Sequence, residues 1–349
     1  MRKGIYYRKC DQPVATLFKD KYITADITPV VAAVVNRVMK EPADEIHALN
    51  CDGNHYAYRV NIGGRQMLFR GDTTQDDDEY MLAEVAFIKA AANAGVPVPQ
   101  VYACDVTMEF EACRWQLLEW IPGKALVDFD RRKCLDRQTV AAQLGVIFRR
   151  LHSIPMDGFG FANTEVLKQT GRLQGIYTTY PEYFHCRLDE HLDYLLHEKL
   201  LPKDAITRVV AALERLALLL ERRQGYVVHR DPAFWNIIGG AASVAAIIDW
   251  DDAVSGDPAD DIGLMMCFES QEFVAEVLKT YGEVKDDFMT RAYLHFLRNM
   301  LWKMVIRHRN GYFRQDSSFF LNVASAPGQS LYDVTLGKIM LALRECEKC

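Results

Sequence analysis

Apolar and polar residues alternate over short distances in the first third of the chain. The alternation covers residues 48–60 and 65–70, and the turn-forming sequence Asn61-Ile62-Gly63-Gly64 joins the two runs. Together with a Gly-containing loop around Gly53, this pattern predicts a meander of three short strands.

A helix and a further strand are expected next. Residues 80–92 have helical spacing, and Asn93-Ala94-Gly95 should end the helix because the prolines in Val96-Pro97-Val98-Pro99 cannot continue it. Residues 115–120 form an apolar run typical of a buried strand, which Ile121-Pro122-Gly123 breaks.

Most of the remaining chain has the spacing of helices. The clearest segments are 137–152, 205–222, 288–309 and 334–344. A chain of 349 residues, half of them apolar, exceeds the size that one hydrophobic core usually serves. We therefore expect two lobes, the first a small sheet lobe with one or two helices and the second mainly helical.

One segment interrupts the helical part with short strands. Residues 226–228 and 243–248 are apolar enough to be buried strands. Between them, residues 236–238 followed by Gly239-Gly240 predict a hairpin arm and its turn.

Three polar side chains lie at the ends of these strands, in loops, where sites are usually built: Asp231, Asn236 and Asp249. Magnesium bound to a nucleoside triphosphate takes oxygen ligands, which Asn236 and Asp249 can supply. An acceptor hydroxyl needs a carboxylate within hydrogen-bond reach as it loses its proton, and Asp231 is the candidate. The alternative is structural: Asp231 begins a turn before Pro232, and Asp249 caps the next element.

The segments His229-Arg230-Asp231 and Ile248-Asp249-Trp250 resemble the catalytic loop and the metal segment of the aminoglycoside phosphotransferase and choline kinase family. These proteins are small-molecule kinases with a protein-kinase-like fold. The resemblance extends from about Ala48 to Met266 and is nearest to the hygromycin-type members.

The resemblance implies an α+β fold with a small N-terminal antiparallel sheet lobe and a larger, mainly helical C-terminal lobe. The implied divisions are a nucleotide-binding lobe over residues 1–117, a hinge over 118–123 and a catalytic and substrate-binding lobe over 124–349.

Nucleotide-binding roles also follow from the resemblance. Gly53 lies in the loop that covers the nucleotide phosphates in the family, and Arg70 stands where many relatives carry a phosphate-contacting lysine. Hygromycin-type members also carry arginine there, and a guanidinium binds phosphate as a fork whereas an ammonium binds it as a point charge. Glu84 is the implied partner of Arg70, with Glu79 as a nearby competitor.

Further roles are implied at the hinge and beside the catalytic loop. The backbone of Glu119, Trp120 and Ile121 would hold the purine base, which does not distinguish ATP from GTP. His229 would support the catalytic loop, and Asp261 would cap the following helix and brace that loop. The aromatic residues Tyr180, Tyr183 and Phe184 are either core or pocket lining.

The implied activity is transfer of the terminal phosphoryl group of ATP or GTP, with one or two Mg²⁺, to a hydroxyl of an aminoglycoside or aminocyclitol; antibiotic resistance is one role for such an enzyme. The alternatives are a kinase of choline or another amino alcohol, and a catalytically silent nucleotide-binding relative, for which Arg70 is the hint. A protein kinase is disfavoured because Asp249-Trp250-Asp251 replaces Asp-Phe-Gly and Gly256-Asp257-Pro258 follows too soon for an activation loop. No P-loop sequence occurs.

Amino-acid composition restricts the expected binding partners and the expected cellular compartment. A net charge of -6 and a pI near 5.9 disfavour a nucleic-acid partner, although they permit a cationic acceptor. Nine scattered cysteines, with Cys346 and Cys349 as a lone pair, favour a reduced cytoplasm over a disulfide framework or zinc site. No stretch has the roughly 20 apolar residues of a membrane span, and the oligomeric state is left open.

Overall fold

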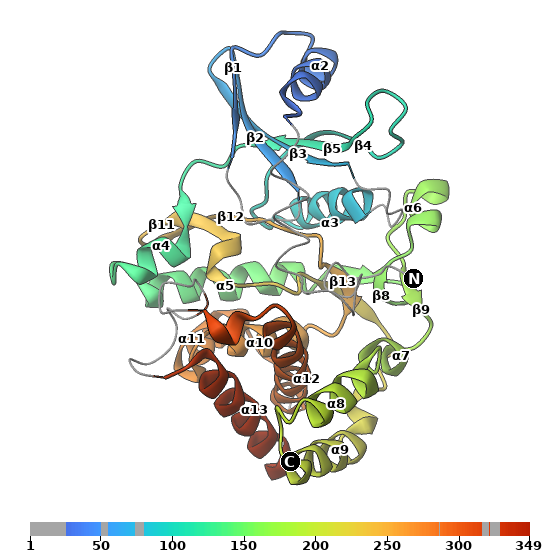
Figure 1. Cartoon of the computed structure of the whole chain (residues 1–349), viewed down its shortest axis with the longest axis vertical. Coiled ribbons are helices and arrows are strands. Elements are labelled where there is room, and N and C mark those ends of the chain that lie inside the picture. The colour runs from blue at the N-terminus through green and yellow to red at the C-terminus, as the bar shows by residue number, and fades with distance from the viewer. Residues whose placement is uncertain (1–25, 50–54, 74–79, 286, 316–320, 322–328) are drawn as a thin grey trace.

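The computed structural model describes residues 26–49, 55–73, 80–285, 287–315, 321 and 329–349. A twisted sheet lies at one end of the molecule and most of the helices lie at the other (Figure 1). Gly53, predicted to lie in the loop over the nucleotide phosphates, and Glu79, the alternative partner of Arg70, lie outside the described residues. No described helix is long and apolar enough to cross a membrane.

The sheet of the first lobe has five antiparallel strands in the order β1-β2-β3-β5-β4. The strands are β1 (Glu45–Ala48), β2 (Tyr56–Ile62), β3 (Arg65–Asp72), β4 (Val101–Asp105) and β5 (Arg114–Glu119). Gly63 and Gly64 connect β2 to β3 with φ angles of 54° and 79°. Two consecutive positive φ angles match the twist of a tight hairpin, which explains the glycine pair. The predicted three-strand meander is confirmed.

One helix that the sequence pattern did not predict covers this sheet. Helix α2 (Thr28–Met39) turns Val31 and Val35 toward the sheet, where they join a small hydrophobic cluster with Phe69. This cluster gives the sheet a core of its own, separate from the larger core of the helical lobe.

Helix α3 (Tyr80–Asn93) lies between the sheet and the helical lobe (Figure 1). Its apolar residues Phe87 and Ile88 belong to the larger hydrophobic cluster, not to the small one. The same helix carries Glu84, which is buried. Because α3 packs toward the lower lobe, Glu84 is held between the two lobes.

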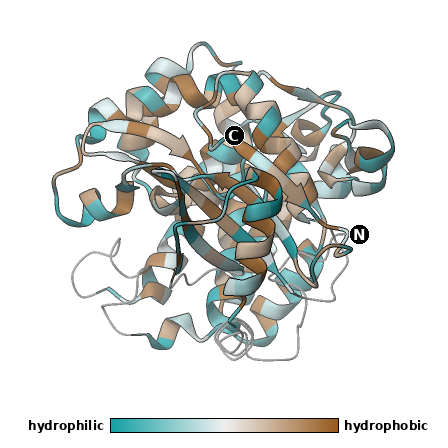
Figure 2. Ribbon diagram, turned by 90° about the horizontal axis from the view of Figure 1, so that it is seen from above, coloured by the Kyte–Doolittle hydropathy of each residue, from teal (hydrophilic) through white to brown (hydrophobic). Residues whose placement is uncertain are grey.

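The second lobe is built around α12, whose residues Leu294, Leu297, Met300 and Leu301 are fully buried. Helices α10 and α13 pack along α12, and α11 packs along α5. Seen from above, hydrophobic segments concentrate inside the molecule and hydrophilic ones toward its outline (Figure 2). The helices are α4 (Leu126–Arg131), α5 (Arg137–Leu151), α6 (Thr164–Thr170), α7 (Tyr180–Phe184), α8 (Leu188–His197), α9 (Lys203–Arg215), α10 (Ala259–Phe268), α11 (Gln271–Tyr281), α12 (Phe288–Arg309) and α13 (Leu331–Lys348).

Two predicted helices differ in extent from those observed. The single helix expected over 205–222 ends at Arg215 and continues as the 3-10 turn Ala217–Leu220. This tighter turn buries Leu220 while Leu218 stays exposed, so tertiary packing overrides the helical propensity of the leucine run. The last helix is longer than its predicted core of 334–344, because the Ser330 side chain caps it by accepting from the Asp333 amide.

Eight short strands form two small sheets in the second lobe, in the orders β12-β11-β6 and β7-β10-β13-β8-β9. The strands are β6 (Lys124–Ala125), β7 (Pro155–Met156), β8 (Phe159–Ala162), β9 (Gly175–Tyr177), β10 (Gly225–Val228), β11 (Ile237–Gly240), β12 (Ser243–Ile247) and β13 (Val254–Gly256). The strands predicted over 226–228 and 243–248 are confirmed.

The predicted turn at Gly239-Gly240 is wrong. Both glycines pair within the β11–β12 ladder, and the turn falls on residues 241–242. A side chain at Gly239 would place its Cβ 1.9 Å from the Ser243 carbonyl oxygen. The glycine therefore allows close approach of the two strands at a bulge instead of turning the chain.

Candidate active site

The catalytic loop runs from the end of β10 to β11, and a buried aspartate from α10 holds its backbone. Asp261 accepts hydrogen bonds from the amides of His229 (2.9 Å) and Arg230 (2.8 Å). It also contacts Nε2 of His152 at 2.9 Å. Burial opposes ionisation, but the bond from His152 and its charge lower the pKa of Asp261 overall. The carboxylate therefore fixes the start of the loop.

The capping role predicted for Asp261 is wrong. Asp261 lies inside the first turn of α10. The residue at the cap position is Pro258, which makes no side-chain capping hydrogen bond. Asp257 instead accepts from the Ala259 amide at 3.1 Å. A carboxylate one turn into a helix can point sideways toward another segment, which is how Asp261 reaches the loop.

His229 joins the catalytic loop to the end of β12. The Asp231 amide donates to Nδ1 of His229 at 3.2 Å, so Nε2 carries the proton and donates to the Ile248 carbonyl at 3.1 Å. The ring packs edge-on against Trp250, with 4.6 Å between centroids. Burial lowers the pKa of His229 and favours this neutral form.

Arg230 turns away from the loop and into the helical lobe. Its φ of 68° is uncommon for a residue other than glycine. The guanidinium contacts the Tyr183 hydroxyl, lies 3.5 Å from Asp260 and donates to Asn299 at 3.3 Å. Burial alone would lower the pKa of Arg230, but Tyr183 and Asp260 raise it overall. These contacts offset the backbone strain and make Arg230 a structural anchor.

Asp231 lies at the mouth of the loop with one carboxylate oxygen engaged. Asn236 Nδ2 donates to Asp231 Oδ2 at 2.7 Å, and Trp235 Nε1 lies 3.4 Å from the same oxygen. Asn236 also donates to the Asp231 carbonyl at 3.1 Å. Both side-chain donors reach Oδ2, which leaves Oδ1 to accept a proton from a bound hydroxyl.

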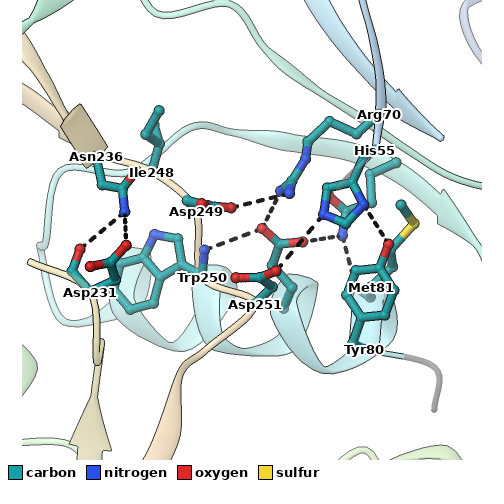
Figure 3. Close-up of polar contacts among 12 residues, drawn as sticks. His55, Arg70, Tyr80, Met81, Asp231, Asn236, Ile248, Asp249, Trp250 and Asp251 are labelled. Atoms are coloured by element: carbon teal, nitrogen blue, oxygen red, sulfur yellow. Dashed lines mark hydrogen bonds and ion pairs between the residues drawn. The ribbon is translucent and has the colours of Figure 1, made fainter. Parts of the chain in front are cut away.

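Asp249 follows β12, and its carboxylate points toward the guanidinium of Arg70 (Figure 3). Its φ is 65°, a conformation that aspartate tolerates better than most residues. Its Oδ1 lies 3.2 Å from Nη2 of Arg70, and its side chain is 43% exposed. Partial burial and the carboxylate of Asp251 raise the pKa of Asp249 well above its usual range, against the effect of Arg70. The two neighbouring carboxylates of Asp249 and Asp251 make the site negative, which favours binding of a cation.

These residues fit a magnesium ion that is shared with phosphates. The side-chain nitrogen Nδ2 of Asn236 donates to Asp231. The side-chain oxygen Oδ1 of Asn236 is therefore the atom that can bind a metal together with Asp249. Among the described residues, no three His, Cys, Asp or Glu side chains form a complete metal cage. Mg²⁺ commonly takes only one or two carboxylates from the protein and completes its shell with phosphates and water.

Arg70 and Glu84 link the sheet to the metal segment. Nη1 of Arg70, from β3, donates to Glu84 Oε1, and the same oxygen accepts from the Trp250 amide at 3.2 Å. Glu84 Oε2 accepts from Gln116 of β5 at 2.8 Å. Burial opposes charge on Arg70, but Glu84 and Asp249 raise its pKa overall. The predicted pairing of Arg70 with Glu84 is present, and Glu84 connects its own helix α3 to β3, β5 and the segment after β12.

Two further polar residues of the site, Gln116 and His55, were not predicted from the sequence. Gln116 is fully buried between Trp115 and Leu117, so a polar residue inside an apolar strand was the available signal. His55 lies 3.8 Å from Asp251 and 2.7 Å from the Tyr80 hydroxyl. The segments that carry His55, Tyr80 and Asp251 are separated in the sequence, and no motif spacing links them.

The segment predicted to be the hinge, residues 118–123, begins within the last two residues of β5. Glu119 ends the strand, its carboxylate accepts from the Gln100 amide at 3.0 Å, and the Trp120 amide donates to Gln66 at 3.3 Å. The guanidinium of Arg59 lies 5.7 Å from the Trp120 ring. Base binding by the backbone of Glu119, Trp120 and Ile121 stays a prediction.

The aromatic residues left open between core and pocket are core. Tyr180, Tyr183 and Phe184 lie in α7 and are all buried. Tyr180 and Phe184 both pack against His295 of α12. They hold α7 onto the helical lobe.

Three solved structures are similar to this chain over most of their length. Aminoglycoside phosphotransferase APH(4)-Ia has a TM-score of 0.63 at 16% identity, covering 92% of this chain and 99% of its own. A putative fructosamine-3-kinase from Haemophilus somnus 129PT has a TM-score of 0.59 at 15% identity, covering 93% and 99%. Spectinomycin phosphotransferase APH(9)-Ia, solved with ADP and spectinomycin, has a TM-score of 0.59 at 13% identity, covering 89% and 98%. The predicted protein-kinase-like fold is confirmed.

Sequence comparison adds one curated relative and a family. Acyl-CoA dehydrogenase family member 10 of Mus musculus is 25% identical over 222 residues, which is 59% of this chain. The match spans only 18% of that relative's length, so its name describes a much longer protein. The profile of the phosphotransferase enzyme family matches residues 46–295. Because this match covers more than half of the chain, the protein belongs to the phosphotransferase enzyme family.

Proposed function

We propose that the protein is a small-molecule kinase that transfers the terminal phosphoryl group of ATP or GTP to a hydroxyl. The observation that carries the proposal is a connected set of contacts at the candidate site. Asn236 contacts Asp231, and its backbone carbonyl oxygen accepts from the amide of Ile248 at 2.9 Å, next to Asp249. Asp249 in turn contacts Arg70, which Glu84 holds. These are the groups that phosphoryl transfer needs: a carboxylate for the acceptor, oxygen ligands for a metal, and a fixed cation for phosphates.

Each residue has a distinct role in this proposal. Asp231 orients the acceptor hydroxyl and takes its proton through Oδ1, while Asn236 and Trp235 hold Oδ2. Arg70 presents its guanidinium fork to the phosphates, and Glu84 fixes the direction of that fork. Asn236 and Asp249 would hold one or two Mg²⁺, which neutralise phosphate charge when bound.

The acceptor is the open part of the proposal. An aminoglycoside or aminocyclitol is one candidate, since hygromycin B and spectinomycin occupy solved structures of the same fold. A metabolite such as choline or another amino alcohol is the second candidate. A catalytically silent relative is the third, but the presence of Asp231 together with both metal-binding candidates gives it little support.

The test measures nucleoside diphosphate release by the purified protein with Mg²⁺ and ATP or GTP. Acceptors include aminoglycosides, hygromycin B, spectinomycin, choline and ethanolamine. Asp231→Ala should abolish acceptor-stimulated release, while titration calorimetry with a non-hydrolysable ATP analogue should give nearly unchanged affinity. Asp204→Ala, on the exposed surface of α9, is the control. Survival of turnover in Asp231→Ala would rule out this mechanism.

A further inference from the structure

Three cationic side chains lie close together beside the catalytic loop. Lys303 and Arg307 lie one turn apart on α12, and Lys338 lies on α13. Helix α12 packs against both α10 and α13. The three side chains meet near the C-terminal end of α10, and we call Lys303, Arg307 and Lys338 the cationic cluster.

The cationic cluster contacts neutral groups. Nζ of Lys338 donates to two carbonyl oxygens at the end of α10, at 3.0 and 2.7 Å, and Arg307 donates to a buried threonine hydroxyl at 2.6 Å. Glu269, the carboxylate whose charge acts on Lys338, is already paired with Arg137. Within the described part of the chain, no member of the cluster forms an ion pair with a carboxylate.

Lys303 is the member that reaches toward the catalytic loop. Its Nζ lies 4.5 Å from the centre of the Phe268 ring. Phe268 packs edge-on against Trp235 with 4.7 Å between centroids, and Trp235 Nε1 lies 3.4 Å from Oδ2 of Asp231. A continuous set of contacts therefore joins the catalytic carboxylate to a half-buried ammonium through two half-buried aromatic rings.

Leaving this charge uncompensated is costly. Burial lowers the pKa of Lys303, and the negative charges of Asp231 and Asp252 only partly oppose this effect. Burial likewise lowers the pKa of Lys338 to about 8 and that of Arg307 to about 10. A negative group bound at Lys303 would supply the missing counter-charge.

We propose that the acceptor carries an oxyanion, a carboxylate or a phosphate, and that Lys303 binds it while Trp235 and Phe268 line an apolar portion between the oxyanion and the reacting hydroxyl. This inference rests on the proposed kinase function. A polycationic acceptor such as an aminoglycoside would be repelled by the positive charge of the cationic cluster and is therefore disfavoured.

The experiment compares four probes of equal chain length, each with a hydroxyl at one end and a carboxylate, phosphate, amine or second hydroxyl at the other. The protein is first saturated with Mg²⁺ and a non-hydrolysable ATP analogue, so that anions cannot occupy the nucleotide phosphate site. Titration calorimetry then gives the Kd of each probe. Lys303→Met removes the charge and keeps the apolar stem, and Lys303→Arg keeps the charge. Lys279→Met, at an exposed pair on α11, is the matched control.

We expect an anionic probe to bind at least about 10-fold more tightly than the amine and the diol, as for a charge-assisted hydrogen bond. Lys303→Met should remove this preference, while Lys303→Arg and Lys279→Met keep it. Preference for one anion identifies the oxyanion as carboxylate or phosphate. Tighter binding of the amine, absence of anion binding, or an unchanged preference in Lys303→Met would overturn the inference. Failure of the ATP analogue to bind would instead count against the kinase function, and that measurement is separate.

Discussion

Asp261→Asn is expected to loosen the catalytic loop while leaving the fold intact. The carboxylate accepts from the amides of His229 and Arg230 and from His152, and it is fully buried. An asparagine has one accepting oxygen, so at most two of these bonds survive, and its NH₂ group faces a buried N–H donor. Losing one charge-assisted bond and leaving donors unsatisfied costs about 3 kcal/mol. This is a large fraction of the usual net stability of about 5–15 kcal/mol.

Hydrogen exchange measures this effect where it occurs. About 3 kcal/mol corresponds to roughly 100-fold faster opening, so the peptide containing His229 and Arg230 should exchange about that much faster, while peptides from the middle of α12 change less. Urea unfolding should show a lower midpoint with an unchanged slope. Asp204→Asn, on the exposed surface of α9, should stay within about 0.5 kcal/mol of the parent. Unchanged protection of the loop would refute the bracing role of Asp261.

The same substitution predicts a dependence on pH. Because the folded-state pKa of Asp261 is lowered, its ionised form stabilises the native state above the unfolded-state pKa of about 3.9. The contribution is lost as pH falls below that value and through the folded-state pKa. The stability difference between parent and Asp261→Asn should therefore be constant near neutral pH and shrink in acid. A stability difference that grows in acid would contradict the lowered folded-state pKa of Asp261.

The remaining predictions concern the nucleotide. Asp249→Asn should weaken nucleotide binding about 10-fold or more with Mg²⁺ but not with EDTA, because it removes the negative charge of the proposed metal ligand; equal losses in both conditions would exclude a metal role. Glu84→Gln should raise the KM for nucleotide and lower stability by about 3 kcal/mol, because the buried guanidinium of Arg70 loses the more buried of its two charged partners. Unfolding in urea and initial-rate kinetics check this, and an unchanged KM would mean that Glu84 does not orient Arg70.

Local sequence was enough to predict much of the fold and the catalytic loop. Gly63-Gly64 marks a tight turn whatever surrounds it, because only backbone freedom is required there. Asp231 and Asn236 are five residues apart and contact each other directly, so their pairing depends on one short loop. The periodicity of 288–309 located α12 to the residue, because a long helix with a buried face repeats one signal many times.

The predictions failed where the role of a residue depends on which segment packs against it. Gly239 resembles a turn residue, but its role is to let Ser243 of the opposite strand approach closely. Asp261 resembles a helix cap, but it reaches sideways to the catalytic loop 31 residues earlier. The sequence shows which residue is present in such cases, but not which segment will pack against it.

Only the tertiary structure decided how the candidate site is assembled. Arg70 meets Glu84 across 14 residues of sequence and Asp249 across 179. The cationic cluster brings together α12 and α13 at the end of α10, and no periodicity predicts that meeting. Hydrophobic spacing and turn chemistry act between near neighbours, so sequence alone determined the elements and the short catalytic loop. The positions of charges between lobes depend on how those elements pack, which is a property of the whole chain.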